Sequence, residues 1–149
     1  MKLVLLEDGR PGLLNDYGVV DISSAISQLV GKSGQSAMET IIEHFDDLRP
    51  QLTRLAKEGT ALPMSNVQLQ APIPQPSKIL CMGGNFTEFG HRSPGPMWGF
   101  LKTSDAVIGP GSTVVLPSID ANIFHHEAEL VLVFGKAGKN VTESNAFDH

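Results

Sequence analysis

Every second residue is proline in the stretch Ala71-Pro72-Ile73-Pro74-Gln75-Pro76. Proline fixes φ and has no backbone N–H, so this stretch cannot continue a helix or occupy the middle of a sheet. Alternating prolines favour an extended backbone, which suits either a stiff connector or a proline-rich recognition motif. We favour the connector. The sequence then predicts a small N-terminal domain over residues 1–70, a linker over 71–77, and the first part of a second domain over 78–149.

Composition favours a soluble globular protein that binds neither nucleic acid nor membrane. The 149 residues are 41% apolar and 18% charged, and the formal net charge is −5. An acidic chain is not attracted by default to nucleic acids or anionic membranes. No apolar stretch is long enough to span a bilayer or to form a signal peptide. The single cysteine, Cys81, allows no internal disulfide,. These features predict a cytoplasmic protein.

The first part of the chain has the pattern of a small α+β unit. Apolar runs at residues 2–6, 13–14 and 19–22 predict three strands,. Asp8-Gly9 and the polar segment 15–18 separate these runs and are typical of hairpin turns,.

A short helix capped by Ser23 or Ser24 and ended by Gly31 is predicted after the strands, and two further helices follow it,. Ser36 and Glu39 have the spacing of a capping box at a helix N-terminus,. Pro50 is expected to end the first of these two helices and to open a second, short one that stops at Gly59,. The apolar residues that precede this proline share one helical face: Met38, Ile41, Ile42, Phe45 and Leu48,.

The second part of the chain is predicted to be rich in strands. Apolar runs at residues 78–82, 100–102, 113–116 and 125–134 each have the composition of a strand,. Four strands are few for a self-sufficient sheet domain. We therefore expect either a fragment of a longer protein or a chain that borrows a partner to complete its core.

Two carboxylates lie one residue apart near the start of the last predicted strand. Because side chains alternate along a strand, Glu127 and Glu129 share one face, and the run is apolar on both faces beyond them,. At the entrance of a buried strand, two such groups would repel each other and lose hydration. They would need a shared proton, a basic partner or a cation, and oxygen ligands suit Mg²⁺, Mn²⁺ or Ca²⁺. The alternative is an exposed strand end with two solvated acids.

Three blocks of the second part stand out by their order and spacing: Lys78-Ile79-Leu80-Cys81-Met82-Gly83-Gly84-Asn85-Phe86, Phe100-Leu101-Lys102-Thr103-Ser104-Asp105-Ala106-Val107-Ile108-Gly109-Pro110-Gly111 and His125-His126-Glu127-Ala128-Glu129-Leu130. In order and approximate spacing they resemble the fumarylacetoacetate hydrolase family. Residues 1–67 also resemble the small N-terminal domain of bacterial members. The resemblance implies an α+β, β-rich chain: a small N-terminal domain followed by the start of a mixed β-sandwich or roll, apparently truncated.

The same resemblance implies a set of metal ligands. Glu127 and Glu129 match the paired ligands of the family, and a further aspartate ligand of family members lies beyond the last residue of this sequence. The segment Phe86-Thr87-Glu88-Phe89 is similar to the Tyr-Thr-Asp-Phe of eukaryotic members, whose aspartate is a ligand. Glu88 is therefore a candidate additional ligand.

Two further residues are candidates for catalysis. Many bacterial members carry a catalytic histidine where this sequence has Phe89, whereas in eukaryotic members a histidine follows slightly later, which makes His91 a candidate base. Lys102 corresponds to a lysine near the substrate pocket, where a cation can hold a carboxylate or an enolate oxygen. The alternatives are a solvated loop histidine and a solvated lysine at a strand end. Arg92 is a weaker candidate for binding a substrate carboxylate.

The chemistry implied by the resemblance is metal-assisted cleavage of a C–C bond. A divalent ion chelated by a 1,3-dicarbonyl or 2-oxo acid stabilises a developing enolate, and a histidine can activate water. We therefore expect a hydrolase of an acylpyruvate or fumarylacetoacetate-like substrate in aromatic-compound or amino-acid catabolism, acting as a homodimer. The alternatives are a lyase or isomerase of the same family, such as a decarboxylase or hydratase of 2-oxo acids, and a noncatalytic truncated module without a complete metal site.

Overall fold

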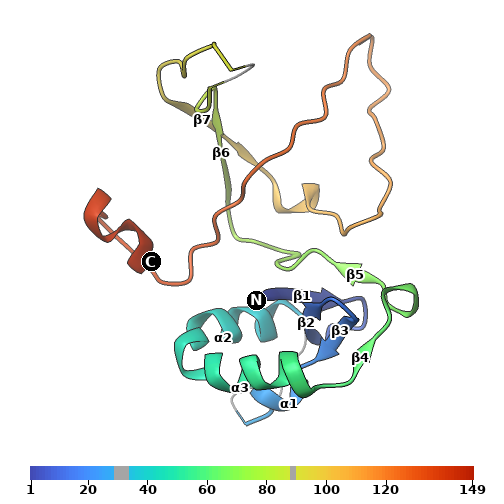
Figure 1. The fold of residues 1–149 in the computed structure, drawn as a ribbon. Coiled ribbons are helices and arrows are strands. Elements are labelled where there is room, and N and C mark those ends of the chain that lie inside the picture. Colours follow the sequence, from blue (N-terminus) through green and yellow to red (C-terminus); the bar gives the residue numbers. More distant parts are fainter. Residues whose placement is uncertain (29–33, 88–89) are drawn as a thin grey trace.

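The computed structural model describes residues 1–28, 34–87 and 90–149. Two separate sheets organise the chain (Figure 1). A five-stranded sheet, with strand order β4-β3-β2-β1-β5, lies in the N-terminal unit (residues 1–70), and a two-stranded sheet, β6-β7, lies in the C-terminal unit (residues 78–149). The fold is α+β and rich in sheet, as the sequence predicts.

An antiparallel meander forms the centre of the larger sheet. It consists of β1 (Lys2–Leu6), β2 (Pro11–Asn15) and β3 (Gly18–Asp21), so the three predicted strands are confirmed. The first turn needs a residue with positive φ, which Gly9 supplies at 84°,. In the second turn the Oδ1 atom of Asn15 accepts hydrogen bonds from the backbone N–H groups of the two residues that follow Asp16,.

In the described residues, three helices follow the meander: α1 (Ser23–Ile26), α2 (Gln35–Glu43) and α3 (Phe45–Glu58). The predicted break at Pro50 is wrong, because α2 gives way to α3 at His44 and Pro50 lies inside α3. The proline removes one intrahelical hydrogen bond. Leu48 and Leu52 on either side of it are buried, and this burial outweighs the lost bond,.

The predicted capping box at the start of α2 is also wrong. Gly34 occupies the N-cap position, and Ser36 lies one residue inside the helix, where its carbonyl oxygen accepts a hydrogen bond from the Thr40 hydroxyl. The spacing of Ser36 and Glu39 was compatible with a box, but the chain enters the helix two residues earlier.

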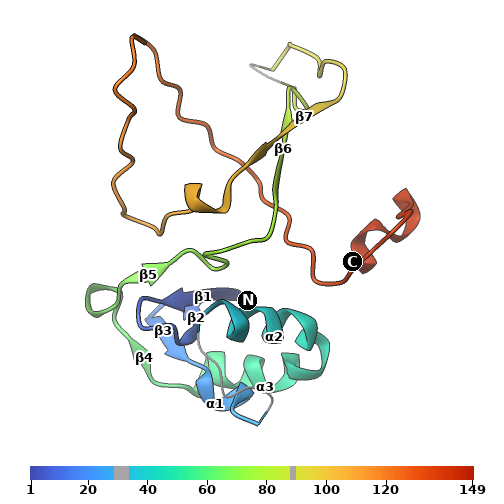
Figure 2. The same cartoon turned by 180° about the vertical axis from the view of Figure 1, so that it is seen from behind.

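The apolar core lies between the larger sheet and the three helices. Figure 2 shows from behind how the helices lie together beside the strands. Beyond Leu52, no side chain in the described part of the chain is buried. The core thus belongs entirely to the N-terminal unit. Its buried residues are Leu5, Leu13, Ile22, Ala25, Ile26, Ala37, Met38, Ile41, Leu48 and Leu52.

Two short strands close the edges of the larger sheet after α3. β4 (Ala61–Leu62) pairs with β3, and β5 (Leu69–Gln70) pairs with β1 after the 3₁₀ turn η1 (Met64–Asn66). The side-chain amide of Gln70 donates hydrogen bonds to the carbonyl oxygens of Leu6 and Glu7, at 3.1 and 2.5 Å. The chain therefore leaves the N-terminal unit from a strand that is fixed to β1.

The C-terminal unit contains one regular hairpin and long extended segments. β6 (Ile79–Gly83) pairs antiparallel with β7 (Trp98–Lys102), which confirms two of the predicted strands. Two 3₁₀ turns follow, η2 (Ser104–Ala106) and η3 (Glu143–Asp148). Between them the chain makes a wide excursion away from the N-terminal unit (Figure 1).

The predicted strands at residues 113–116 and 125–134 are wrong for this structure, which has no strand in either range. A strand is completed by hydrogen bonds to a neighbour, and no described segment pairs with either range,. Both ranges are extended and exposed; the side chain of Val115 is 85% accessible and that of Leu130 78%. Their composition favours strands, but the pairing that would define a strand is missing.

The end of the described chain returns to the N-terminal unit. The carbonyl oxygen of His149 accepts hydrogen bonds from the N–H groups of Gly135 and Lys136, at 2.8 and 3.0 Å. A shallow hollow separates this segment from the helices, and its apolar lining comes from both units: Leu3, Ile42, Phe45, Val133 and Phe147. In the described ranges no helix combines the length and apolar character needed to cross a membrane.

Substituting a core leucine should reveal how unevenly stability is distributed along the chain. Leu52 is 0% exposed, whereas Leu132 is 72% exposed. We expect Leu52→Ala to lower the free energy of unfolding by about 2–5 kcal/mol, because it removes buried methyl groups and leaves a cavity. The matched change Leu132→Ala should alter it by less than about 0.5 kcal/mol. Urea unfolding followed by circular dichroism measures both, and equal effects would contradict the assignment of the core.

An ion-pair cluster fixes the meander to the start of α1. Arg10 lies between Asp8 and Asp21, with nitrogen–oxygen distances of 2.7 and 2.5 Å. Hydrogen bonds from the Arg10 backbone and side chain hold the pKa of Asp8 below its usual value. Burial alone would raise the pKa of Asp21, but hydrogen bonds from Ser23 and Arg10 outweigh that effect and lower it. The ionised forms of both carboxyl groups are therefore favoured in the folded state.

The cluster should make the N-terminal unit sensitive to acid. A carboxyl group whose pKa is lower in the folded state than in the unfolded state stabilises the fold when it is ionised. For Asp21 this stabilisation is present above the unfolded-state pKa, near 3.8, and it is lost as the pH falls through the lower pKa of the folded state. We expect Asp21→Asn to lower the free energy of unfolding by about 0.2–1 kcal/mol at pH 6, the range of exposed ion pairs. The difference from the unsubstituted protein should shrink at pH 3. Asp16→Asn is the control, because Asp16 is an exposed residue of the neighbouring turn that takes no part in the ion-pair cluster.

Candidate functional site

The β6–β7 hairpin positions Lys102 at the end of an aromatic stripe. In the register, Trp98 lies opposite Gly83, and Lys102 lies opposite Ile79. Alternate residues of β7 share a face, so Trp98, Phe100 and Lys102 follow one another along it. The rings of Trp98 and Phe100 stack with centroids 5.7 Å apart, and the Lys102 Nζ atom lies 5.8 Å from the Phe100 centroid. The lysine ammonium is exposed at the open end of this stripe,.

A glycine makes room for the tryptophan at the other end of the stripe. A Cβ atom at Gly83 would overlap the Trp98 ring. Gly84 then adopts a φ of 60°, and its carbonyl oxygen accepts a hydrogen bond of 3.1 Å from the N–H of Gly95. The loop that carries the candidate catalytic residues is thus closed at its base by a backbone hydrogen bond.

The loop residues are described in part. His91 and Arg92 are exposed in the loop between β6 and β7. Glu88 and Phe89 lie outside the described residues. The assignment of Glu88 as a ligand and of His91 as a base therefore stays a prediction.

Glu127 and Glu129 are exposed in the extended segment that precedes residue 134. Neither carboxylate has a hydrogen-bond or ion-pair partner in the described part of the chain, so their surroundings are those of two solvated acids. Among the described residues no group of three or more His, Cys, Asp or Glu side chains is close enough to hold a metal ion. Two carboxylates have the right donor chemistry for a hard divalent ion. The third predicted ligand, Glu88, lies outside the described residues.

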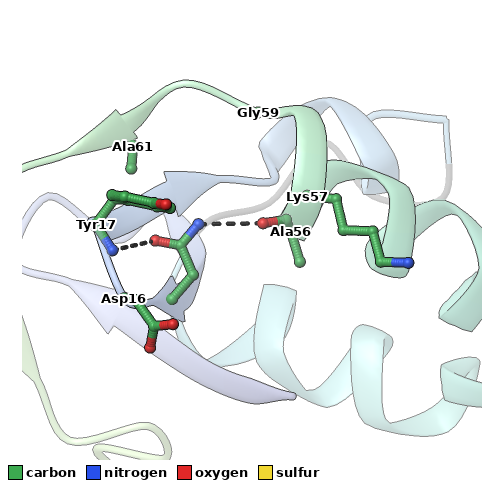
Figure 3. Close-up of a pocket in the computed structure, with 7 residues that line it drawn as sticks. Asp16, Tyr17, Ala56, Lys57, Gly59 and Ala61 are labelled. Carbon is green, nitrogen blue, oxygen red and sulfur yellow. Dashed lines mark hydrogen bonds between the residues drawn. The ribbon is translucent and has the colours of Figure 1, made fainter.

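A different hollow lies in the N-terminal unit, and it contains none of the predicted site residues (Figure 3). The side-chain amide of Asn15 donates a hydrogen bond of 3.1 Å to the Ala56 carbonyl oxygen near the end of α3. Its Oδ1 atom accepts one of 2.9 Å from the Tyr17 N–H. Asn15 therefore connects a β-turn to a helix end, which is a structural role. The hollow is lined by Asn15, Asp16, Tyr17, Ala56, Lys57, Gly59 and Ala61.

Comparison with known proteins assigns the C-terminal unit. Residues 78–149 match the family model described as fumarylacetoacetate (FAA) hydrolase C-terminal. This segment of the chain belongs to the fumarylacetoacetate hydrolase family. The match begins directly after the proline-rich linker, and the resemblance seen in the sequence is confirmed.

Similar proteins of this family include an isomerase and a hydrolase. The chain is 33% identical over 120 residues to the mitochondrial oxaloacetate tautomerase fahd2 of Xenopus laevis. The alignment covers 78% of the chain and 34% of that protein. It is 24% identical over 168 residues to maleylpyruvate hydrolase of Aquipseudomonas alcaligenes. This alignment covers 100% of the chain and 58% of the relative. The chain spans about a third of the length of the first curated relatives, at 35% and 34%.

A solved family member has a similar fold. The crystal structure of maleylpyruvate hydrolase from Sphingobium sp. SYK-6, in complex with manganese(II) and pyruvate, superposes with a TM-score of 0.65 at 26% identity. The superposition covers 80% of this chain and 43% of that structure. The α+β fold is therefore that of a fumarylacetoacetate hydrolase family protein over most of the chain.

The sequence analysis missed the contact between Gly83 and Trp98. Its only signal was the pair of glycines that follows the first strand of the C-terminal unit. A glycine directly opposite a large aromatic residue is a pairing that becomes visible only when the register of the hairpin is known.

Substitution of Gly83 should disturb the aromatic stripe. Because a methyl group at this position would overlap the ring, we expect Gly83→Ala to displace Trp98 from its stack with Phe100. Trp98 is the single tryptophan of the chain, so its fluorescence reports this change directly. Gly95→Ala is the control, since no atom lies within 4 Å of a Cβ built there. Unchanged emission in the Gly83 variant would contradict the proposed packing.

Proposed function

We propose that the chain functions as a divalent-metal-dependent hydrolase, which cleaves a C–C bond in an acylpyruvate or a fumarylacetoacetate-like 2-oxo acid. The observation that carries the proposal is the family match of residues 78–149, which include the Glu127–Glu129 pair. The similar fold of a maleylpyruvate hydrolase, solved with manganese and pyruvate, supports both the metal and the class of substrate. We place this activity in aromatic-compound or amino-acid catabolism in the cytoplasm.

Glu127 and Glu129 are the proposed ligands, with Glu88 as a further one. The ion, Mg²⁺ or alternatively Mn²⁺ or Ca²⁺, would supply Lewis-acid stabilisation of negative charge on the substrate oxygens. The exposed position of the two carboxylates leaves them free to accept such an ion without first breaking an ion pair.

His91 and Lys102 are the proposed catalytic residues. His91 would accept a proton from the attacking water, since the unperturbed pKa of imidazole suits a base near neutral pH. The Lys102 ammonium would hold a carboxylate or enolate oxygen of the substrate. Its position at the open end of the aromatic stripe leaves all its hydrogen-bond donors available to a substrate,.

A second candidate function is isomerisation of a 2-oxo acid. The similarity to an oxaloacetate tautomerase supports it, and so does the phenylalanine at residue 89, where bacterial hydrolases carry a histidine. An isomerase needs the metal site but no attacking water. A decarboxylase or hydratase would use the same ligands. A noncatalytic module is the third candidate, and it is supported by the lack of any group of three or more metal-ligating side chains among the described residues.

We further propose the domain division 1–70, 71–77 and 78–149, and a homodimer as the working assembly. The division follows from the location of the buried core within the first 52 residues and from the family match that begins at Lys78. The homodimer is supported by the many apolar side chains that the C-terminal unit exposes,.

The two glutamates provide the direct test of the metal proposal. We expect Glu127→Gln and Glu129→Gln each to weaken Mn²⁺ binding by at least about tenfold, because each substitution removes one anionic ligand. Mn²⁺ titration followed by electron paramagnetic resonance measures the affinity. Glu143→Gln changes an exposed glutamate on η3 and is the matched control. Equal affinity in all four proteins would show that the pair is not a metal site.

Product analysis separates the candidate reactions. Hydrolysis of an acylpyruvate with saturating Mn²⁺ should release pyruvate and a carboxylic acid, and His91→Ala should reduce that rate by at least about 100-fold. A tautomerase would interconvert the enol and keto forms of oxaloacetate without net cleavage. If Mn²⁺ binds through the two glutamates but neither substrate is turned over, the noncatalytic module is the correct interpretation.

A further inference from the structure

A side chain of α2 forms hydrogen bonds with the backbone of the proline-rich linker. The N–H of Gln75 donates a hydrogen bond of 2.6 Å to the Gln35 Oε1 atom, and the Gln35 Nε2 atom donates one of 2.9 Å to the Gln75 carbonyl oxygen. The side-chain amide of Gln35, at the first residue of α2, thus pairs with the main chain of the linker as a strand residue would,.

A neighbouring carboxylate fixes the orientation of this amide. The Gln35 Nε2 atom also donates a hydrogen bond of 2.7 Å to the Glu39 Oε1 atom. An ionised carboxylate only accepts hydrogen bonds, so the amide nitrogen must face Glu39 and the amide oxygen is left for the Gln75 N–H. All three polar groups are matched in one arrangement, which we call the Gln35 clasp (Gln35, Glu39 and Gln75).

The alternation of prolines makes this clasp specific. Pro72, Pro74 and Pro76 have no N–H, so Ile73 and Gln75 provide the only backbone donors between residues 72 and 76,. The clasp uses the donor of Gln75, and the Ile73 side chain packs against the buried core of the N-terminal unit. The linker therefore has one polar and one apolar attachment to that unit.

The clasp lies a few residues before the start of the C-terminal unit. β6 begins at Ile79, three residues after Pro76. The hydroxyl of Ser104, at the start of η2, donates a hydrogen bond to the Pro76 carbonyl oxygen. The open end of the hairpin, where β6 begins and β7 ends, thus lies next to the linker.

We propose that Gln35 is a positioning residue that turns the proline-rich linker into a strap, which holds the β6–β7 hairpin in one orientation relative to the N-terminal unit. Stiff prolines alone would only keep the segment extended. The clasp adds the attachment that fixes its direction. This inference concerns the arrangement of the two units and holds whichever reaction the protein catalyses.

Amide hydrogen exchange tests the clasp at a single atom. In the unsubstituted protein the Gln75 amide should be protected, and Gln35→Ala should accelerate its exchange by at least about tenfold, because the acceptor of its hydrogen bond is removed. Gln51→Ala is the matched control, because Gln51 lies on α3 and its side chain has no hydrogen-bond partner among the described residues. Unchanged exchange at Gln75 in the Gln35 variant would overturn the proposal.

Distance measurements test the orientation itself. Spin labels at Lys57→Cys on α3 and Leu80→Cys on β6, in a Cys81→Ala background, should give a narrow distance distribution that broadens with Gln35→Ala. Gln75→Pro removes the donor from the linker without altering α2, and it should broaden the distribution as well. Thermal unfolding followed by circular dichroism verifies that each variant keeps the folded N-terminal unit. Two folded variants with the distribution of the parent protein would refute the strap.

Discussion

Burial of apolar side chains between the larger sheet and α2–α3 is the interaction on which the rest of this structure depends. Leu5 and Leu13 from the meander meet Ile41 and Leu52 from the helices, all within the first 52 residues. Burying a side chain of this size contributes about 1.5–3 kcal/mol, and no later side chain in the described ranges is buried. The strands at the edges of the larger sheet and the Gln35 clasp attach to the unit that contains this core.

The regular structure of the C-terminal unit has a different origin, because it rests on the pairing of β6 with β7 and not on a buried core. The β6–β7 hairpin satisfies its own backbone hydrogen bonds, yet Leu80 and Leu101 remain exposed on one face while the aromatic stripe lies on the other. A two-stranded hairpin with apolar side chains on both faces is the pattern of a sheet whose two faces are covered.

The sequence predicted best those features whose causes are local. Asp8-Gly9 and Asn15 define turns through φ preference and side-chain hydrogen bonds within a few residues, so the meander followed from the sequence. Pro50 misled because its local effect on a helix is smaller than the burial of Leu48 and Leu52 beside it, which depends on the sheet. The Gln35 clasp joins residues 40 positions apart and leaves no trace in a sequence pattern.

The candidate metal site also depends on contacts between residues that are far apart in the sequence. The family resemblance identified the Glu127–Glu129 pair, but the strand that should carry it is not formed in this structure. The composition of residues 125–134 favours a strand, but a strand forms only when a neighbouring segment provides backbone hydrogen-bond partners. The composition of the segment does not reveal whether such a neighbour is present.

The exposure of the two carboxylates also bears on when they would need an ion. Two unit charges 4 Å apart interact by about 1 kcal/mol in bulk water and by about 4 kcal/mol at the effective dielectric constant of a protein surface. In their present surroundings Glu127 and Glu129 are therefore tolerated without a cation. If the segment paired into a sheet that covered its apolar faces, the repulsion would rise and the carboxylates would lose hydration, so that a divalent ion would stabilise them. Under the proposed function, metal binding and closure of the sheet would then be one coupled event, as they are wherever a site is assembled by folding.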